Sequence, residues 1–284
     1  MAAGDDKAAG TVRRQPGKPL LLRSVPGMPQ DTLRRDTVDL PTPDGPADAY
    51  FTRPADGGPH PAVLIFMDAI GVRPRLEEMA DRIAAQGYAV LVPNVFFRAG
   101  RAPVVPDLVN RLQSEERASV MGELRPLMQA LTPERLAQDT TAYLDFLDAQ
   151  SDVAAGPIAT TGYCMGGAMS LRAAAQYPDR VVAAASFHGG NLAPDDPAGA
   201  HQGASRIRAE VYAAHADNDA SMPPEQVARL EQALDEAGVT YTSEVYTGAS
   251  HGFTMSDMAV YDTAAEQRHW DAFLGLLARK LPTG

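Results

Sequence analysis

The only cysteine of the chain stands inside a glycine-rich hexapeptide, Gly162-Tyr163-Cys164-Met165-Gly166-Gly167. The spacing Gly-x-Cys-x-Gly is that of a nucleophile elbow with sulfur in place of a hydroxyl oxygen, a turn too sharp for side chains two positions either side of the nucleophile. Segments 156–161 and 168–175 predict the strand before the turn and the helix after it. A lone cysteine is usually a small core hydrophobe, but burial does not require three neighbouring glycines. We therefore interpret Cys164 as a nucleophile.

A nucleophilic thiol needs a base for its proton and an acid that orients the base. Asp219 follows a predicted strand that ends near Ala214, and His251 follows one that ends near Tyr246. The order Cys, Asp, His is that of hydrolase triads on open α/β sheets, whose sites lie at the carboxyl ends of the strands. Asp217 is an alternative acid.

The five other histidines give weaker signals. His188 and His215 lie near strand ends and could line a pocket, although a surface or packing role is the simpler interpretation for each. His60, His201 and His269 have no chemical partners in the sequence. The histidines show no metal-ligand spacing, and the elbow lacks the Lys-Ser/Thr of a phosphate loop. We expect no metal and no cofactor.

The elements that must position these residues alternate between strand and helix. A continuous apolar run such as 61–66 is typical of a strand buried on both faces. Thr132 and Pro133 have the residue types of a helix N-cap and first helical position. We predict strands at 61–66, 88–92, 156–161, 181–187, 209–214 and 240–246, with helices at 76–87, 133–147, 168–175, 224–237 and around 270–277. This alternation predicts an α/β protein, a mainly parallel twisted sheet with helices on both faces.

Two segments depart from this alternation. Residues 94–131 form a longer connection than most and carry Arg98, Arg101, Arg111 and Arg117, so we predict a short lid insertion beside the site. Residues 1–36 lack a long apolar run and predict a mobile N-terminal arm before a single domain of residues 37–284.

Composition limits the partners. The net charge of −11 argues against nucleic acid or an anionic membrane surface as a partner. No apolar run approaches the roughly 18 residues of a membrane span. One cysteine permits no internal disulfide and suits a reducing compartment. We expect a cytoplasmic monomer or homodimer that acts on a small molecule.

Together these residues resemble the dienelactone hydrolase family over about residues 40–280, which implies an α/β-hydrolase fold. The resemblance rests on the elbow, on the Asp-x-x-Met-Pro turn at 219–223 and on the Ser-His-Gly-Phe segment at 250–253. Segments 66–72 and 87–98 are similar to two further family blocks. In those blocks Asp68 replaces a glutamate, Asn94 an aspartate and Phe96 a tyrosine.

The resemblance implies a role for each matching position. Cys164 would be the nucleophile, His251 the base and Asp219 the orienting acid. Asp68 would correspond to the family glutamate that helps to ionise the thiol. The backbone N–H groups of Met165 and Ala69 would form the oxyanion hole.

The same resemblance implies the substrate contacts, which are Arg98, Phe96, Phe253 and Met255. Members that act on muconate-type lactones hold the substrate carboxylate with arginines, one of them four positions after the catalytic histidine. That position is Met255 here. The replacement predicts a preference for a neutral ester or lactone.

The expected function is therefore hydrolysis of a carboxylic ester or lactone through a cysteinyl acyl-enzyme. A thioesterase or lyase-like activity on the same triad is an alternative, because a fold does not fix its chemistry. A non-hydrolytic thiol-sensing or binding protein is an alternative of another class. The intact triad weighs against it, since a sensor needs no aligned base.

Overall fold

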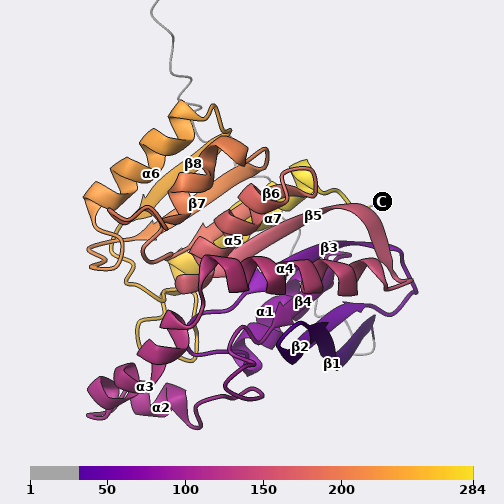
Figure 1. Ribbon diagram of the computed structural model, residues 1–284, viewed down its shortest axis with the longest axis horizontal. Coiled ribbons are helices and arrows are strands. Elements are labelled where there is room, and N and C mark those ends of the chain that lie inside the picture. The colour runs from indigo at the N-terminus through magenta and orange to yellow at the C-terminus, as the bar shows by residue number, and fades with distance from the viewer. Residues whose placement is uncertain (1–31, 284) are drawn as a thin grey trace, which may run out of the picture.

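A computed structural model describes residues 32–283, which form a twisted sheet between two layers of helices (Figure 1). Most of the predicted N-terminal arm, residues 1–31, lies outside the described residues. The first strand begins at Leu33, four residues before the expected start of the domain near Thr37.

The sheet has eight strands in the order β1-β2-β4-β3-β5-β6-β7-β8. β2 pairs antiparallel with both of its neighbours, whereas every pair from β4 to β8 is parallel. This confirms the predicted mainly parallel α/β fold. The strands are β1 (Leu33–Thr42), β2 (Gly45–Pro54), β3 (His60–Phe66), β4 (Ala89–Pro93), β5 (Val153–Tyr163), β6 (Val181–Phe187), β7 (Glu210–Ala216) and β8 (Tyr241–Tyr246).

The helices lie in two layers. Arg82 of α1 stacks on Trp270 of α7 at 4.4 Å from the ring centroid, so these two helices cover the same face. The other face carries α4 and α5, which pack against each other and can be followed in Figure 1. The helices are α1 (Pro74–Ala84), α2 (Leu108–Leu112), α3 (Arg117–Gln129), α4 (Pro133–Asp148), α5 (Met165–Gln176), α6 (Pro224–Glu236), α7 (Thr263–Lys280) and the 3₁₀ helix η2 (Ala200–Arg206).

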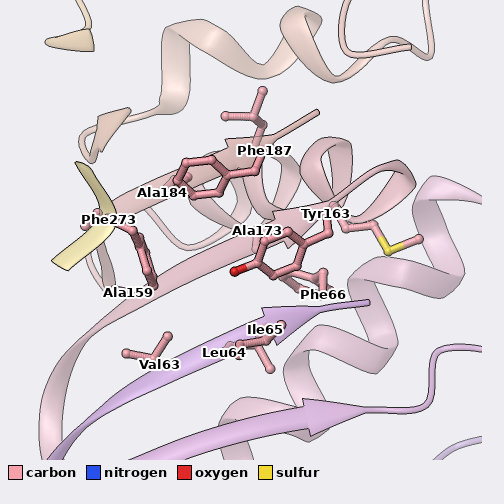
Figure 2. Close-up of a cluster of buried hydrophobic side chains, with 14 of the residues drawn as sticks. Val63, Leu64, Ile65, Phe66, Ala159, Tyr163, Ala173, Ala184, Phe187 and Phe273 are labelled. Carbon is pink, nitrogen blue, oxygen red and sulfur yellow. The ribbon is translucent and has the colours of Figure 1, made fainter. Parts of the chain in front are cut away.

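The core lies along the central strands. Figure 2 shows side chains of β3, β5 and β6 packed against those of α5 and α7. Burial of each large apolar side chain stabilises the fold by about 1.5–3 kcal/mol. The predicted cap of α4 is confirmed, because the side chain of Thr132 accepts a hydrogen bond from the backbone N–H of Arg135.

The β1–β2 hairpin was not predicted. β1 exposes alternate side chains, and β2 buries polar residues, among them Asp48 and Arg53. Arg53 donates to Asp36 at 2.7 Å and to Asp152 at 2.6 Å. The polar pairs therefore hide the apolar pattern by which a buried strand is recognised.

Candidate active site

Cys164 occupies the turn between β5 and α5. Its backbone has φ 55° and ψ −120°, a conformation with positive φ that costs a non-glycine residue roughly 1–3 kcal/mol. The side chain is half-buried. The predicted strand-turn-helix context is thus present.

The glycines around the cysteine are required by packing. A Cβ atom at Gly162 would lie 1.9 Å from the carbonyl oxygen of Gly166, and one at Gly166 would lie 2.2 Å from that of Phe66. A Cβ atom at Gly167 would lie 2.2 Å from the hydroxyl of Ser186. Because real Cβ contacts are never so short, larger residues would displace the elbow.

Asp219 and His251 meet on neighbouring loops, after β7 and β8. Oδ2 of Asp219 lies 2.5 Å from Nδ1 of His251. Oδ1 of Asp219 accepts hydrogen bonds from the backbone N–H and the hydroxyl of Ser221, at 2.8 and 2.7 Å. Burial raises the pKa of Asp219, but the hydrogen bonds from His251 and Ser221 outweigh it and lower the pKa to about 2. The carboxylate is therefore ionised at neutral pH and fixes the imidazole.

His251 also interacts with Cys164. Burial lowers the pKa of His251, but its hydrogen bonds with Asp219 and Cys164, together with their charges, raise it to about 10. Since Nδ1 faces Asp219, Nε2 is the nitrogen that remains for the sulfur. The His251 side chain is 31% exposed, so a substrate can reach it.

Asp217, the alternative acid, has another partner. Its Oδ2 accepts a hydrogen bond from the backbone N–H of Gly248 at 2.9 Å, and its own N–H donates to the carbonyl of Ala249 at 2.8 Å. Asp217 thus holds the loop that carries His251, and Asp219 is the carboxylate that contacts the imidazole.

Asp68, on the turn after β3, pairs with an arginine. Its two oxygens face Arg73, with Oδ1 at 2.8 Å from Nη1 and Oδ2 at 3.0 Å from Nη2. Oδ1 also accepts hydrogen bonds from the backbone N–H groups of Ile70 and Gly71, at 3.0 and 3.3 Å. This carboxylate is thus engaged by a permanent cation and by its own turn, and its expected role beside Cys164 stays a prediction.

Two of the four expected substrate contacts lie in segment 94–98. Arg98 forms a bidentate pair with Asp139 at 2.8 Å and donates to Asp44 at 2.7 Å. Phe96 is buried, and its backbone N–H donates to the side chain of Asn94. The guanidinium of Arg98 is engaged by two carboxylates, and Phe96 presents almost no surface. Their expected substrate roles stay predictions.

The other two expected contacts, Phe253 and Met255, are core residues of the loop after His251. Their exposed fractions are 0% and 1%. The ring of Phe253 stacks with Tyr246 at 5.2 Å and packs against the imidazole of His188 at 5.0 Å. Both side chains therefore anchor the loop to the protein core, and neither offers a surface to a substrate in this structure.

Segment 94–131 contacts two loops of the candidate site, and its expected role as a lid stays a prediction. Val105, Leu108, Val120 and Leu124, of which the last three lie on α2 and α3, form a small apolar cluster. Ala69 and Ile70, on the turn after β3, pack against it. Gln113, the residue after α2, accepts a hydrogen bond from the backbone N–H of Ala259 at 2.8 Å. The insertion thus contacts the turn that carries Ala69 and the loop that carries His251.

The remaining histidines near the strand ends are buried packing residues. His188 lies with its ring centroid 5.3 Å from that of His251, and its Nε2 is 2.7 Å from the hydroxyl of Thr254. Burial, followed by the charge of His251, lowers the pKa of His188 well below its usual value. His215 bonds Ser243, and burial lowers its pKa to about 4. Both rings are neutral at neutral pH.

Sequence reasoning missed several residues of the site. Ser221 lies within the recognised Asp-x-x-Met-Pro turn, where its hydroxyl could have been suspected from its distance of two residues from the acid. Arg73 and Asp257, which are 2.6 Å apart, are separated by 184 residues and carry no local signal.

Residues 32–283 contain no group of three His, Cys, Asp or Glu side chains arranged to hold a metal ion. Among their helices, none is both long and apolar enough to cross a membrane. The expected absence of a cofactor, the oligomeric state and the cytoplasmic location stay predictions.

Known proteins resemble this chain in sequence and in fold. The model of the dienelactone hydrolase family matches residues 47–281. A protein of Methylorubrum extorquens named "Putative carboxymethylenebutenolidase" is 25% identical over 239 residues, covering 82% of this chain and 77% of that protein. One of the same name from Escherichia coli K12 is 24% identical over 261 residues, covering 89% and 90%. A crystal structure titled "Putative Dienelactone Hydrolase", from Klebsiella pneumoniae, aligns with a TM-score of 0.74 and 23% identity, covering 87% of this chain and 99% of that one.

Proposed function

Because the chain belongs to the dienelactone hydrolase family and is an ester or lactone hydrolase, we propose that it cleaves a neutral ester or lactone through an acyl-enzyme on Cys164. One observation carries the proposal, namely that the imidazole of His251 lies 2.5 Å from Asp219 and also interacts with Cys164. A nucleophile, a base and an orienting acid in contact are the parts that covalent acyl transfer requires.

The reaction proceeds in two halves. The sulfur of Cys164 bonds to the carbonyl carbon, and the C–O bond to the leaving oxygen breaks as the His251 imidazolium protonates that oxygen. The product is a thioester and an alcohol, which for a lactone remain in one molecule. His251 then takes a proton from water, whose oxygen attacks the thioester. The C–S bond breaks, the carboxylic acid leaves, and the cysteine-histidine pair is restored. Proton transfer of this kind typically contributes about 10²–10⁴ to a rate.

Two backbone amides would stabilise the tetrahedral oxyanion. Met165 is the first residue of α5, where an N–H has no acceptor within its own helix. Ala69 lies on the turn after β3, which Asp68 stabilises through two hydrogen bonds. Among the turn and loop hydrogen bonds of residues 32–283, neither amide donates to a backbone carbonyl. Both are therefore available to a developing negative charge.

His251 is the group that receives the thiol proton. Both oxygens of Asp68 are engaged by Arg73, so this carboxylate is not free to take it. Although burial lowers it, the pKa of His251 is raised to about 10 by its hydrogen bonds with Asp219 and Cys164 and by their charges, which places an imidazolium beside Cys164 at neutral pH. Activation of the nucleophile then needs no second carboxylate.

The charge of the substrate follows from the arginines. Of the four arginines named in segment 94–131, three, Arg98, Arg101 and Arg111, are paired with carboxylates. Met255 is apolar and buried. Loss of one charge-assisted contact removes about 1.5–3 kcal/mol of carboxylate binding. We expect kcat/KM for a lactone methyl ester to exceed that for its free carboxylate by roughly tenfold to a hundredfold. A preference for the carboxylate would contradict this assignment.

Replacement of the nucleophile tests the proposal as a whole. Cys164→Ala is expected to lower p-nitrophenyl ester hydrolysis by at least about a thousandfold, with an unchanged melting temperature as the control for folding. Iodoacetamide is expected to label Cys164 in the wild type near neutral pH and to remove activity in proportion to labelling. A fully active Cys164→Ala enzyme would overturn the proposal.

A further inference from the structure

A buried ionic cluster joins two loops of the candidate active site. Arg73 precedes α1 as its N-cap residue, with Pro74 as the first residue of the helix. The side chains of Arg73 and Asp68 are 8% and 5% exposed, and that of Asp257 is 27% exposed. One guanidinium is thus enclosed by two carboxylates from distant parts of the chain.

Every N–H of the Arg73 guanidinium has an acceptor. Nε and Nη2 donate to the two oxygens of Asp257, at 2.6 and 3.3 Å. Nη1 and Nη2 donate to the two oxygens of Asp68, at 2.8 and 3.0 Å, and Nη1 also donates to the carbonyl of Gly71 at 3.0 Å. Five hydrogen bonds match the five donors of arginine. No donor is left for a substrate, so this cation acts on the protein itself.

The two carboxylates lie on segments with different chemical tasks. Asp68 accepts the N–H groups of Ile70 and Gly71 and so fixes the turn that presents the N–H of Ala69. Asp257 lies on the loop between β8 and α7 that also carries His251. Arg73 therefore connects the oxyanion donor with the base, two groups that act on the same carbonyl.

We propose that Arg73 is a positioning residue. Its bridge between Asp68 and Asp257 keeps the amide of Ala69 at a fixed distance and orientation relative to the imidazole of His251. The inference rests on the proposed function, since it needs an oxyanion at Ala69. A misplacement of about 1 Å can cost a hundredfold in rate, and a bidentate ion pair on each side restricts such movement. A lysine has the same charge but lacks the planar guanidinium with its five N–H donors, so it cannot form a bidentate pair with each aspartate.

The test compares Arg73→Met and Arg73→Lys with Arg53→Met. Arg53 is a matched control, because it also joins two aspartates and its side chain is also buried, but it lies on the β1–β2 hairpin. We expect both Arg73 variants to lose roughly tenfold to a hundredfold in kcat with KM changed less than about threefold. Arg53→Met is expected to lower the melting temperature and to leave kcat near that of the wild type.

Two further readouts separate positioning from stability. A trifluoromethyl ketone forms a tetrahedral adduct that needs the oxyanion hole, whereas iodoacetamide alkylates the thiol without it. In the Arg73 variants the Ki for the ketone should rise by the factor that kcat falls, and the alkylation rate of Cys164 should stay within about threefold of that of the wild type. If Arg73→Met does not fold, Asp257→Asn breaks the same bridge at its more exposed end and should show the same pattern.

The outcomes are distinct. Wild-type kcat and ketone affinity in folded Arg73→Met and Asp257→Asn, with Cys164→Ala inactive, would overturn the positioning role and leave the proposed function intact. A kcat loss in Arg53→Met equal to that in Arg73→Met would also overturn it, because any buried ion pair would then have the same effect. An active Cys164→Ala would overturn the proposed function instead.

Discussion

Asp219 and Asp68 both follow strands of the parallel part of the sheet, and both have the residue type of a catalytic acid. Asp219 meets an imidazole, and its pKa is lowered to about 2 by hydrogen bonds from His251 and Ser221 that outweigh burial. Asp68 meets the guanidinium of Arg73 in a bidentate pair. Two carboxylates at the same edge of one sheet thus have partners of very different chemistry.

The difference lies in whether the partner can give up a proton. Imidazole exchanges protons near neutral pH, so the carboxylate that orients it takes part in proton transfer. Guanidinium stays charged at any accessible pH, so a carboxylate paired with it acts as a fixed anchor. A carboxylate beside an active site is therefore assigned by its partner and not by its position alone.

The largest expected effect is on the acid of the triad. Asp219→Asn should lower kcat by orders of magnitude, about 10⁴ by analogy with serine proteases, because the amide favours the wrong tautomer of His251. Asp217→Asn is the matched control, since Asp217 bonds the Gly248 amide and not the ring, and it should reduce kcat only mildly. Steady-state hydrolysis of one ester by both variants decides the matter, and the reverse ranking would transfer the acid role to Asp217.

A smaller effect is expected for Asp68→Asn. The variant loses the ionic half of its pair with Arg73, so kcat should fall by roughly tenfold through a loosened Ala69 turn. The alkylation rate of Cys164 by iodoacetamide should not change, because His251 and not Asp68 receives the thiol proton. A large drop in alkylation would show that Asp68 ionises the nucleophile and that the contrast between the two aspartates is wrong.

The smallest effect concerns stability and pH. The pKa of His251 is raised from 6.5 to about 10 in the folded protein. Its contribution to stability is therefore complete below about pH 6.5 and is lost as pH rises toward 10. The difference in unfolding free energy between the wild type and His251→Gln should shrink over that interval in urea titrations at pH 6, 8 and 10. A difference that grows with pH would contradict the raised pKa.

The part of this molecule that could be predicted from sequence is the part encoded locally. The glycines beside Cys164, the cap at Thr132 and the apolar run of β3 each depend on neighbouring residues, and the structure contains all three features. The triad order followed from strand ends of a parallel sheet.

What could not be predicted depends on pairs that are distant in the chain. Arg73 and Asp257 are 184 residues apart in the sequence, and no periodicity or motif predicts their contact. The pair of Arg98 with Asp139 could not be predicted either, because Asp139 belongs to α4 and the position of that helix next to Arg98 depends on the tertiary fold. Polar pairs such as that of Arg53 with Asp152 hid the β1–β2 hairpin in the same way.

The central claim is that the substrate carbonyl becomes covalently bound to Cys164. Intact-mass spectrometry of the enzyme, quenched in acid within milliseconds of mixing with a p-nitrophenyl ester, tests it most directly. The account predicts a mass increase equal to the acyl group, located by peptide mapping on Cys164, released on further incubation and absent from Cys164→Ala. Full turnover with no acyl adduct at any quench time, or an adduct on another residue that also forms in Cys164→Ala, would contradict it.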